Sequence, residues 1–404
     1  MPAYPTAYPT ACPATYPTAY PTADLAREMT LWRHDFHAHP ELGFAEYRTG
    51  TAVADLLESF GLTVHRGIGG TGVVGVLERG TGTGAIGLRS DMDALPITET
   101  GTAAHCSQTP GVMHACGHDG HMAMLLGAAR HLSRDAAFSG RVVFIFQPNE
   151  ENGLGAPAMI DDGLFTRFPV DQVFAIHNMP GQPAATVETR PGPMTASEAL
   201  FQITIDAIGG HAALPHMGVD AIMVGAEIVT ALQTIVARKL DPGLNGVVSV
   251  TEFTTDGRRN VLPGHATLSG DARALTPEIN ATIEARMRQI TAGIAAAHGA
   301  SAALDYDTIF PPTINDGAAV EAVANAARAL FGPDAVTTAG PAKLFSEDFA
   351  HMAAARPGCF LLLGNGTTGA AARPLHSADY DFNDDILVPG SSLWVTLVKH
   401  RLRA

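Results

Sequence analysis

Short apolar, β-branched runs alternate with stretches of helical periodicity along most of the chain after residue 24. This alternation constrains the fold most, because strands separated by helices form a mostly parallel sheet covered by helices. The predicted strands are Gly72–Leu77, Ala85–Leu88, Arg141–Phe146, Gln172–Ile176 and Cys359–Leu363. The predicted helices are Leu25–Phe36, Thr49–Phe60, His121–Ser133 and Gly317–Phe331. The sequence therefore predicts an α/β fold.

Between residues 195 and 306 the rhythm changes to the order β-α-β-β-α-β, with strands near residues 199–207, 247–253, 266–272 and 302–306. This order is that of a ferredoxin-like α+β unit. Since 404 residues exceed one hydrophobic core, we expect residues 195–306 to be a domain inserted between 24–194 and 307–404. Residues 1–23 repeat Tyr-Pro-Thr and predict an extended or disordered tail, because so many prolines exclude helix and central strand.

Charge and cysteine content exclude several classes of partner. A formal net charge of -15 opposes binding to nucleic acid or to an anionic membrane, so a small-molecule partner is expected. Four unevenly spaced cysteines do not predict a disulfide framework and favour a reducing, cytoplasmic location. The tail lacks the basic start and the continuous apolar stretch of a secretory signal.

Metal-binding side chains follow several predicted strands or precede a predicted helix. Cys116 and His118 lie in a glycine-flanked turn before an apolar helix, and Glu150 and Glu151 follow a strand. His177 ends the strand at residues 172–176, and the lone His376 lies in a loop near the C-terminus. Each has an ordinary alternative, such as a buried cysteine, a capping histidine or a solvated carboxylate pair. Together they form a mixed N, O and S donor set sufficient for two divalent ions.

Nearby carboxylates are candidates for orienting these donors. Asp91 and Asp93 follow the strand at residues 85–88, and Asp119 is next to His118. A carboxylate that accepts a hydrogen bond from a ligating imidazole fixes the orientation of its ring. We expect Asp93 and Asp119, and also Asp91, to act in this way.

Several long motifs between about Leu31 and the C-terminus resemble those of a known protein family. They are RHDFHAHPELGF, LRSDMDALPI, MHACGHDGHMAMLLGAA, VVFIFQPNEENGLGAPAMIDDGLF, GGHAALPHMGVD, SEDF and LHSADYDFND. In these stretches the chain resembles the family of dinuclear metallopeptidases that contains hippurate hydrolases, N-acyl-amino-acid amidohydrolases (aminoacylases) and auxin-conjugate hydrolases. The resemblance implies a metal-bearing α/β domain with an inserted dimerisation domain, and a homodimer or higher homo-oligomer.

The same resemblance implies individual roles. The metal ligands would be Cys116, His118, Glu151, His177 and His376 for two divalent ions per subunit, with zinc or manganese favoured and cobalt or nickel as alternatives. Glu150 would be the general base, and His211 would stabilise the oxyanion in a neighbouring subunit's site. Asn260 and Arg273 would hold a substrate carboxylate, although Arg273 is equally well explained by an ion pair. The chain departs from the usual family pattern in carrying Asn149 and Asn152 beside the glutamates.

The predicted reaction is hydrolysis of the amide bond of N-acyl amino acids, either hippurate-like or N-acetylated. Two divalent ions would polarise the carbonyl and acidify a water molecule, whose proton Glu150 would take. The alternatives are a dipeptidase or carboxypeptidase that uses the same centre, a binding protein that has lost catalysis, and a thiol-nucleophile mechanism through Cys116.

Overall fold

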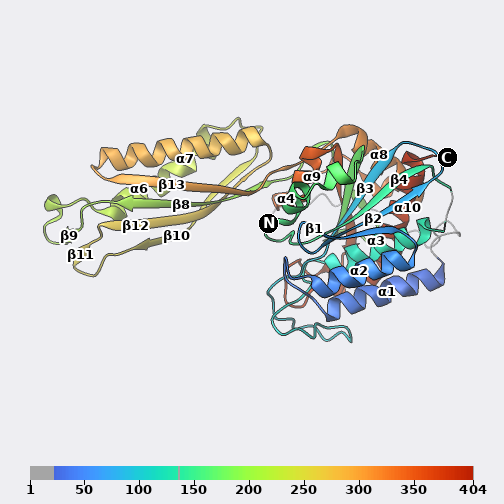
Figure 1. Cartoon of the computed structure of the whole chain (residues 1–404). Coiled ribbons are helices and arrows are strands. Elements are labelled where there is room, and N and C mark those ends of the chain that lie inside the picture. Colours follow the sequence, from blue (N-terminus) through green and yellow to red (C-terminus); the bar gives the residue numbers. More distant parts are fainter. Residues whose placement is uncertain (1–21, 135–136, 404) are drawn as a thin grey trace. The chain divides into compact units, whose positions relative to one another are not determined.

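The computed structural model describes residues 22–134 and 137–403, so the Tyr-Pro-Thr repeat lies outside the described residues apart from the last positions of the expected tail. The chain divides into two compact units. The first contains the chain up to Met194, Ile314–Pro341 and the chain from Asp348 onward, and the second contains Thr195–Thr313 with Ala342–Glu347 (Figure 1). The expected boundary at residue 306 falls inside a strand that continues to Phe310, so the inserted part is longer than predicted.

The first unit is built on an eight-stranded sheet with the order β1-β2-β4-β3-β5-β16-β6-β15. The central strands β4, β3, β5 and β16 are parallel. The strands β1 and β2 pair antiparallel to their neighbours, and β6 pairs antiparallel with β16 and parallel with β15. The strands are β1 Thr63–Ile68, β2 Gly72–Arg79, β3 Ala85–Asp91, β4 Gly140–Gln147, β5 Gln172–Pro180, β6 Val187–Glu188, β15 Val336–Thr337 and β16 Gly358–Gly366. This sheet confirms the predicted α/β class.

Helices cover both faces of this sheet because alternate strand residues point to opposite faces. Phe144 and Phe146 of β4 belong to the large core packed by α1, α2, α3, α8 and α10, and Figure 1 shows α1, α2 and α3 on that side. On the other face, Phe349 of α9 packs against Phe360 of β16 with ring centroids 6.1 Å apart. The helices are α1 Ala23–Ala38, α2 Tyr47–Ser59, α3 His118–Leu132, α4 Gly155–Asp161, α5 Leu164–Arg167, α8 Gly317–Phe331, α9 Phe349–Ala355 and α10 Leu387–Arg401.

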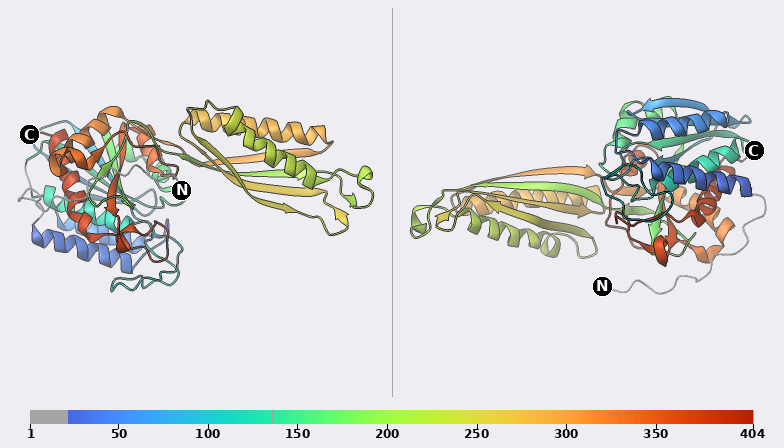
Figure 2. Two further views of the ribbon diagram at one scale, coloured as in Figure 1. Left: turned by 180° about the vertical axis from the view of Figure 1, so that it is seen from behind. Right: turned by 90° about the horizontal axis from the view of Figure 1, so that it is seen from below.

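The second unit has the predicted β-α-β-β-α-β order and a four-stranded antiparallel sheet, β10-β12-β8-β13. Both of its helices lie against one face of the sheet (Figure 2). Its elements are β8 Ser197–Asp206, α6 Ala221–Arg238, β10 Gly246–Thr255, β12 His265–Ala274, α7 Pro277–Ala297 and β13 Ser301–Phe310. A two-stranded ribbon, β9 Gly210–His211 with β11 Val261–Leu262, extends from the same unit.

Helix α6 is unusually apolar for a helix that is only half covered. Its inner face packs through Val224, Ile228 and Leu232, while Ile222 and Met223 remain 44% and 53% exposed. By length and composition alone α6 is long and apolar enough to cross a membrane, with a mean hydropathy of 1.4 and 33% of its residues buried. A core helix of a domain that faces water can have the same length and composition, and α6 packs on its own sheet.

Candidate metal centre

The five predicted ligands converge where the parallel strands end. Cys116 lies just before α3, His118 is the first residue of α3, Glu151 follows β4, His177 lies in β5, and His376 lies in the loop after β16. Their donor atoms form overlapping groups, each within 4.8 Å, that combine Cys116 with His118 and His177, and Cys116 with Glu151 and His376. Helix α3 begins three residues earlier than predicted, because Gly117 adopts φ 93° and turns the chain directly into the helix.

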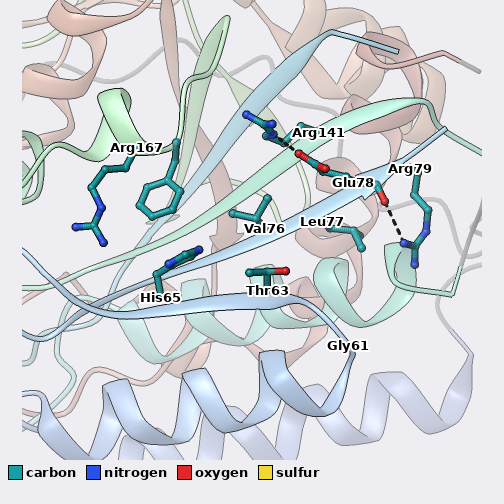
Figure 3. A pocket seen from close by; sticks show the side chains of 10 residues that line it. Gly61, Thr63, His65, Val76, Leu77, Glu78, Arg79, Arg141 and Arg167 are labelled. Atoms are coloured by element: carbon teal, nitrogen blue, oxygen red, sulfur yellow. Dashed lines mark hydrogen bonds and ion pairs between the residues drawn. The ribbon is translucent and has the colours of Figure 1, made fainter. Parts of the chain in front are cut away.

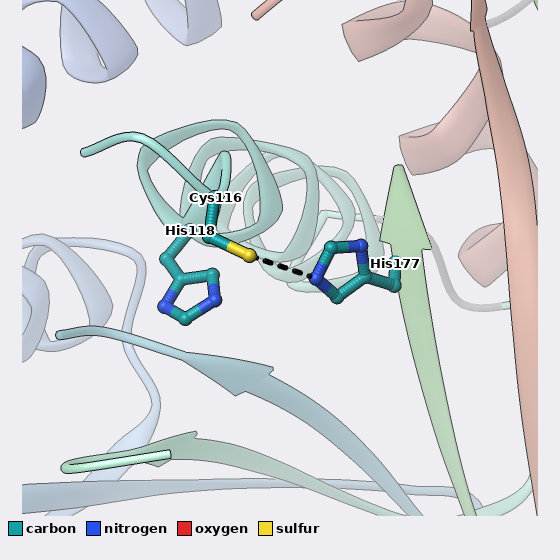
Figure 4. Close-up of side chains that lie close together, drawn as sticks. All are labelled: Cys116, His118 and His177. Atoms are coloured by element: carbon teal, nitrogen blue, oxygen red, sulfur yellow. Dashed lines mark hydrogen bonds between the residues drawn. The ribbon is translucent and has the colours of Figure 1, made fainter. Parts of the chain in front are cut away.

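The donor atoms of the proposed ligands lie close enough to one another to bind the same cation. The Sγ atom of Cys116 lies 3.3 Å from Nε2 of His177, and Figure 4 shows both turned toward each other beside His118. The Oε1 atom of Glu151 lies 3.4 Å from Nε2 of His376 and 3.9 Å from Nε2 of His118. Cys116 belongs to both groups and is therefore placed where a bridging ligand would be needed.

Backbone carbonyl groups orient the two buried imidazoles. Nδ1 of His118 is 2.8 Å from the carbonyl oxygen of Asp93, and Nδ1 of His177 is 2.8 Å from that of Asn178. Protonation at Nδ1 leaves each Nε2 lone pair facing the cluster. Among the described residues, Nε2 of His118 and Oε1 of Glu151 are buried without a hydrogen-bond partner. Divalent cations would satisfy both atoms, so the residues present fit a metal centre.

The protonation of the cluster also fits a site that exchanges protons for metal ions. Burial disfavours charge on His118, but Asp91 and Asp93 outweigh it and raise the pKa to about 10. Burial and the neighbouring Glu151 and Glu150 carboxylates raise the pKa of the Cys116 thiol well above its usual value. Cysteine binds a metal as the thiolate, and histidine binds it as the neutral imidazole. Metal binding would therefore release the protons of the Cys116 thiol and the His118 imidazolium.

Two of the three expected orienting carboxylates, Asp93 and Asp119, differ in whether they contact the cluster. Oδ1 of Asp93 is 3.3 Å from Nδ1 of His118, and its Oδ2 accepts the backbone N–H of Glu151 at 3.0 Å. The direct contact expected between Asp119 and a ligating imidazole is wrong. Oδ2 of Asp119 instead lies 2.8 Å from Nδ1 of His37 and 3.3 Å from Arg33, because the first turn of α3 directs it toward α1.

One further buried histidine was not predicted. Nδ1 of His121 is 2.7 Å from Asp91, and its Nε2 is 2.8 Å from the side-chain oxygen of Asn178. Asp91 therefore orients His121, and its Oδ2 is 3.7 Å from Nε2 of His118. The spacing of His118 and His121, three residues apart on a helix, already places both on one face and was the available signal.

Glu150, the predicted base, is 5% exposed beside the donors. Its Oε2 atom lies 3.9 Å from Nε2 of His118, and its Oε1 accepts the backbone N–H of Asp348 at 3.4 Å. Gln147 and Arg89 both bind the Asp348 carboxylate, which fixes the start of α9 next to Glu150. The carboxylate is thus held beside the cluster by buried groups.

The three remaining predicted residues lie in the second unit. His211 is exposed on β9, and its Nδ1 accepts the backbone N–H of Ala213 at 3.0 Å. Asn260 is exposed in the turn before β11. Arg273 forms ion pairs with Glu198 at 3.0 Å and with Asp271 at 2.8 Å. An ion pair was the expected alternative to a role in substrate binding.

Asn149 has a structural reason to be an asparagine. It is 2% exposed and adopts φ 48°, a left-handed conformation that asparagine tolerates better than alanine. Its side-chain oxygen accepts a hydrogen bond from Asn152, and its backbone N–H donates to Glu46 at 2.8 Å. The two asparagines beside the glutamates therefore bind each other and stabilise the turn.

We expect Asn149→Ala to lower the free energy of unfolding by about 2 kcal/mol, through left-handed strain and a lost hydrogen bond. Urea denaturation of the metal-free protein measures this change. Asn152→Ala is the control, because it removes the hydrogen bond but leaves residue 149 unchanged, and it should cost about 1 kcal/mol. Equal losses in the two variants would mean that the backbone conformation contributes nothing.

His37 provides a pH-dependent contribution to stability. Burial opposes its charge, but Asp119 and Glu99 bind the ring and raise the pKa from 6.5 to about 9. The other titratable or charged groups that face the ring are Arg33, His105 and His114. A raised pKa stabilises the folded state fully below pH 6.5, and this stabilisation is lost as the pH rises through 9.

The stability of the metal-free protein should therefore fall between pH 6.5 and pH 9, by up to about 3 kcal/mol from this group. Urea unfolding at several pH values measures the slope. His37→Gln should flatten the profile across this window, whereas Leu31→Gln, at an exposed position of the same helix, should leave it unchanged. The same slope in wild type and His37→Gln would exclude His37 as its source.

A cavity of about 530 Å³ lies elsewhere on the first unit, along β1 and β2 (Figure 3). Three arginines line it, but each already has a protein partner. Arg141 binds Glu78 at 2.6 Å, Arg79 binds the carbonyl oxygen of Ser133 at 2.6 Å, and Arg167 binds Asp162 at 3.3 Å. None of the predicted site residues lines this cavity, so we assign it no ligand.

Comparison with known proteins agrees with this geometry. A sequence model of peptidase family M20/M25/M40 matches residues 87–400. The chain is 37% identical over 380 residues to a hippurate hydrolase of Campylobacter jejuni, covering 94% of this chain and 98% of the relative. It is 34% identical over 365 residues to thermostable carboxypeptidase 2 of Saccharolobus solfataricus, covering 89% and 91%.

A solved structure extends the likeness to three dimensions. It is a dinuclear metal-binding peptidase of the M20 family from Bacillus subtilis, with a TM-score of 0.82 and 29% identity. The match covers 94% of this chain and 99% of the other. Since the family model spans most of the chain, the resemblance found in the sequence is confirmed, and the chain belongs to peptidase family M20/M25/M40.

Proposed function

We propose that this protein is a metal-dependent amidohydrolase that converts N-acyl amino acids, hippurate-like or N-acetylated, to a carboxylic acid and a free amino acid. The observation that carries the proposal is the convergence of five metal-binding side chains with the buried carboxylate of Glu150. A dinuclear centre beside a carboxylate can polarise an amide carbonyl and activate water for hydrolysis.

Cys116, His118, Glu151, His177 and His376 would hold two divalent ions. Bound ions of this kind polarise an amide carbonyl and make water a better nucleophile near neutral pH. Thiolate and imidazole ligands favour zinc, whereas the carboxylate also suits manganese, and we propose one of these two as the native metal. Cobalt and nickel remain alternatives for the same donor set.

Glu150 would accept the proton of the attacking water and deliver it to the leaving amine. Its Oε2 atom lies 3.9 Å from Nε2 of His118, beside the five proposed ligands. The amine leaves as a neutral group only after its nitrogen is protonated. The proton transfer therefore determines whether the tetrahedral intermediate loses the amine or returns to the substrate. Glu150 is therefore the residue on which the chemical step depends most.

A second copy of the chain would complete the site through His211, whose Nε2 can donate to a developing oxyanion while Nδ1 accepts from Ala213. The second unit suits self-association, since β10 is an edge strand and α6 exposes Ile222 and Met223. The exposed Asn260 is our candidate for the substrate carboxylate. Arg273 would serve that role only by exchanging Glu198 or Asp271 for the substrate.

The alternative is a carboxypeptidase or dipeptidase acting through the same centre, which the carboxypeptidase relative supports. A panel of benzoyl-, acetyl- and aminoacyl-amino acids, assayed after chelation and reloading with Zn, Mn, Co or Ni, separates the two. Our proposal expects the highest kcat/KM on an N-acyl substrate. A higher kcat/KM on aminoacyl substrates would replace it with the alternative. We also propose a cytoplasmic location, which the free cysteines Cys106, Cys116 and Cys359 support.

A further inference from the structure

Arg33 of α1 is a buried cation that touches no predicted metal ligand. It is 1% exposed, and its guanidinium contacts three carboxylates. Nη1 lies 3.3 Å from Asp119 and 3.0 Å from Asp381, and Nε pairs with Asp384. A planar guanidinium donates in several fixed directions, so it can hold three separate segments in one relative arrangement.

The partners of Arg33 lie close in sequence to two of the predicted metal ligands, His118 and His376. Asp119 directly follows His118 and is two residues beyond Gly117, the residue that ends the Cys116 turn. Asp381 and Asp384 follow His376 in a segment that forms no α-helix or strand. Arg33 is therefore a link between the Cys116–His118 turn and the His376 segment.

The two donor groups, which contain His177 and His376 respectively, differ in how firmly other contacts hold their side chains. His118 and His177 are held independently, through Nδ1 contacts to backbone carbonyls of Asp93 and Asn178. His376 is 52% exposed and adopts φ 64°, a left-handed conformation that costs energy in a residue other than glycine. Its backbone N–H binds the carbonyl oxygen of Ala115 at 2.8 Å, and the ion pairs of Arg33 hold the same segment at Asp381 and Asp384.

We propose that Arg33 is a positioning residue that fixes the distance between the Cys116 turn and the His376 segment. The donor group of Cys116, Glu151 and His376 then depends on it more than the group of Cys116, His118 and His177. This inference rests on the proposed metal centre. It assigns Arg33 no contact with substrate, and its effect is on the affinity of one of the two ions.

The test variants keep a cation at position 33, because simple removal of Arg33 would leave three carboxylates without a counter-ion. Asp381→Asn with Asp384→Asn releases the His376 segment while Arg33 still binds Asp119. Arg33→Lys keeps the charge but loses the planar fork. The matched control is Arg48→Lys, which alters an exposed ion pair, 2.8 Å long, between Arg48 of α2 and Asp35 of α1.

Titration of the metal-free proteins with Mn²⁺ and with Zn²⁺, followed by metal analysis after gel filtration, gives two dissociation constants and a stoichiometry. We expect the weaker constant of the Asp381→Asn/Asp384→Asn variant to rise about tenfold or more, and the stoichiometry to fall toward one, while the tighter constant changes little. Arg33→Lys should show a smaller loss in the same ion. Arg48→Lys should match wild type.

Equal weakening of both ions in the segment variant, or no weakening, would overturn the proposal, because a merely structural role does not select one ion. Thermal melting of the metal-free proteins shows whether the variants are folded. If the Asp381→Asn/Asp384→Asn variant is unfolded, Arg33→Lys is the test variant in its place. A wild-type protein that binds fewer than two ions would instead overturn the dinuclear centre itself. The failure of the two proposals is thus distinguishable.

Discussion

Glu150→Gln should lower kcat by about 10³-fold while leaving metal content unchanged. The glutamine keeps the shape of the side chain and can still accept the N–H of Asp348, which lies 3.4 Å from Oε1 in wild type. It cannot take a proton from water, and general-base catalysis of this kind contributes about 10²–10⁴-fold. Steady-state kinetics on the best N-acyl substrate, with metal analysis of the same sample, measures both quantities.

The matched control is Glu78→Gln, since Glu78 is an exposed glutamate that pairs with Arg141 on the cavity of Figure 3. Its kcat should equal that of wild type. Unchanged kcat in Glu150→Gln would remove Glu150 from the mechanism. Loss of metal together with kcat would make Glu150 a ligand, a role that its place in a group with His118 and Glu151 allows.

Much of the fold follows from local sequence patterns. Each predicted strand of the first unit lies within an observed one, and the helix predicted at Gly317–Phe331 has those bounds. Buried parallel strands are continuous apolar runs, which the sequence displays directly. The strands β1, β6 and β15 of the eight-stranded sheet were missed. The strands β6 and β15 have two residues each and depend on pairing with a distant segment rather than on their own pattern. The strand β1 lies at the edge of the sheet, where only Ile68 is buried, and its residues form no apolar run.

The residues of the candidate site could be predicted from the sequence, but the contacts that hold some of them could not. Glycine-flanked and strand-terminal positions identified Cys116, His118 and His177, since parallel strands end at one edge of the sheet. The actual partner of Asp119 was not predictable, because Arg33 and His37 lie 86 and 82 residues away in sequence. Only the packing of α1 against α3 brings them together. Sequence adjacency to His118 suggested the wrong contact.

Cys116→Ala should weaken the binding of both metal ions by more than about 100-fold and abolish hydrolysis. The Cys116 sulfur belongs to both donor groups, so its removal takes one ligand from each ion, whereas loss of a partner outside the ligand set typically costs 10–100-fold. The metal-free protein should remain folded and lose about 1 kcal/mol, since a buried cysteine otherwise acts as a small apolar side chain. Metal titration and urea unfolding of the metal-free protein measure the two effects separately.

Cys359→Ala is the control, because Cys359 is also buried, in β16, with its sulfur 3.3 Å from Thr189, and takes no part in the donor groups. It should lose similar stability and keep both ions. If Cys116→Ala retained two ions but lost hydrolysis, Cys116 would act as a nucleophile rather than a bridge. Chelation of wild type decides the same question independently, because a thiol nucleophile would keep its activity without metal, whereas a metal bridge would not.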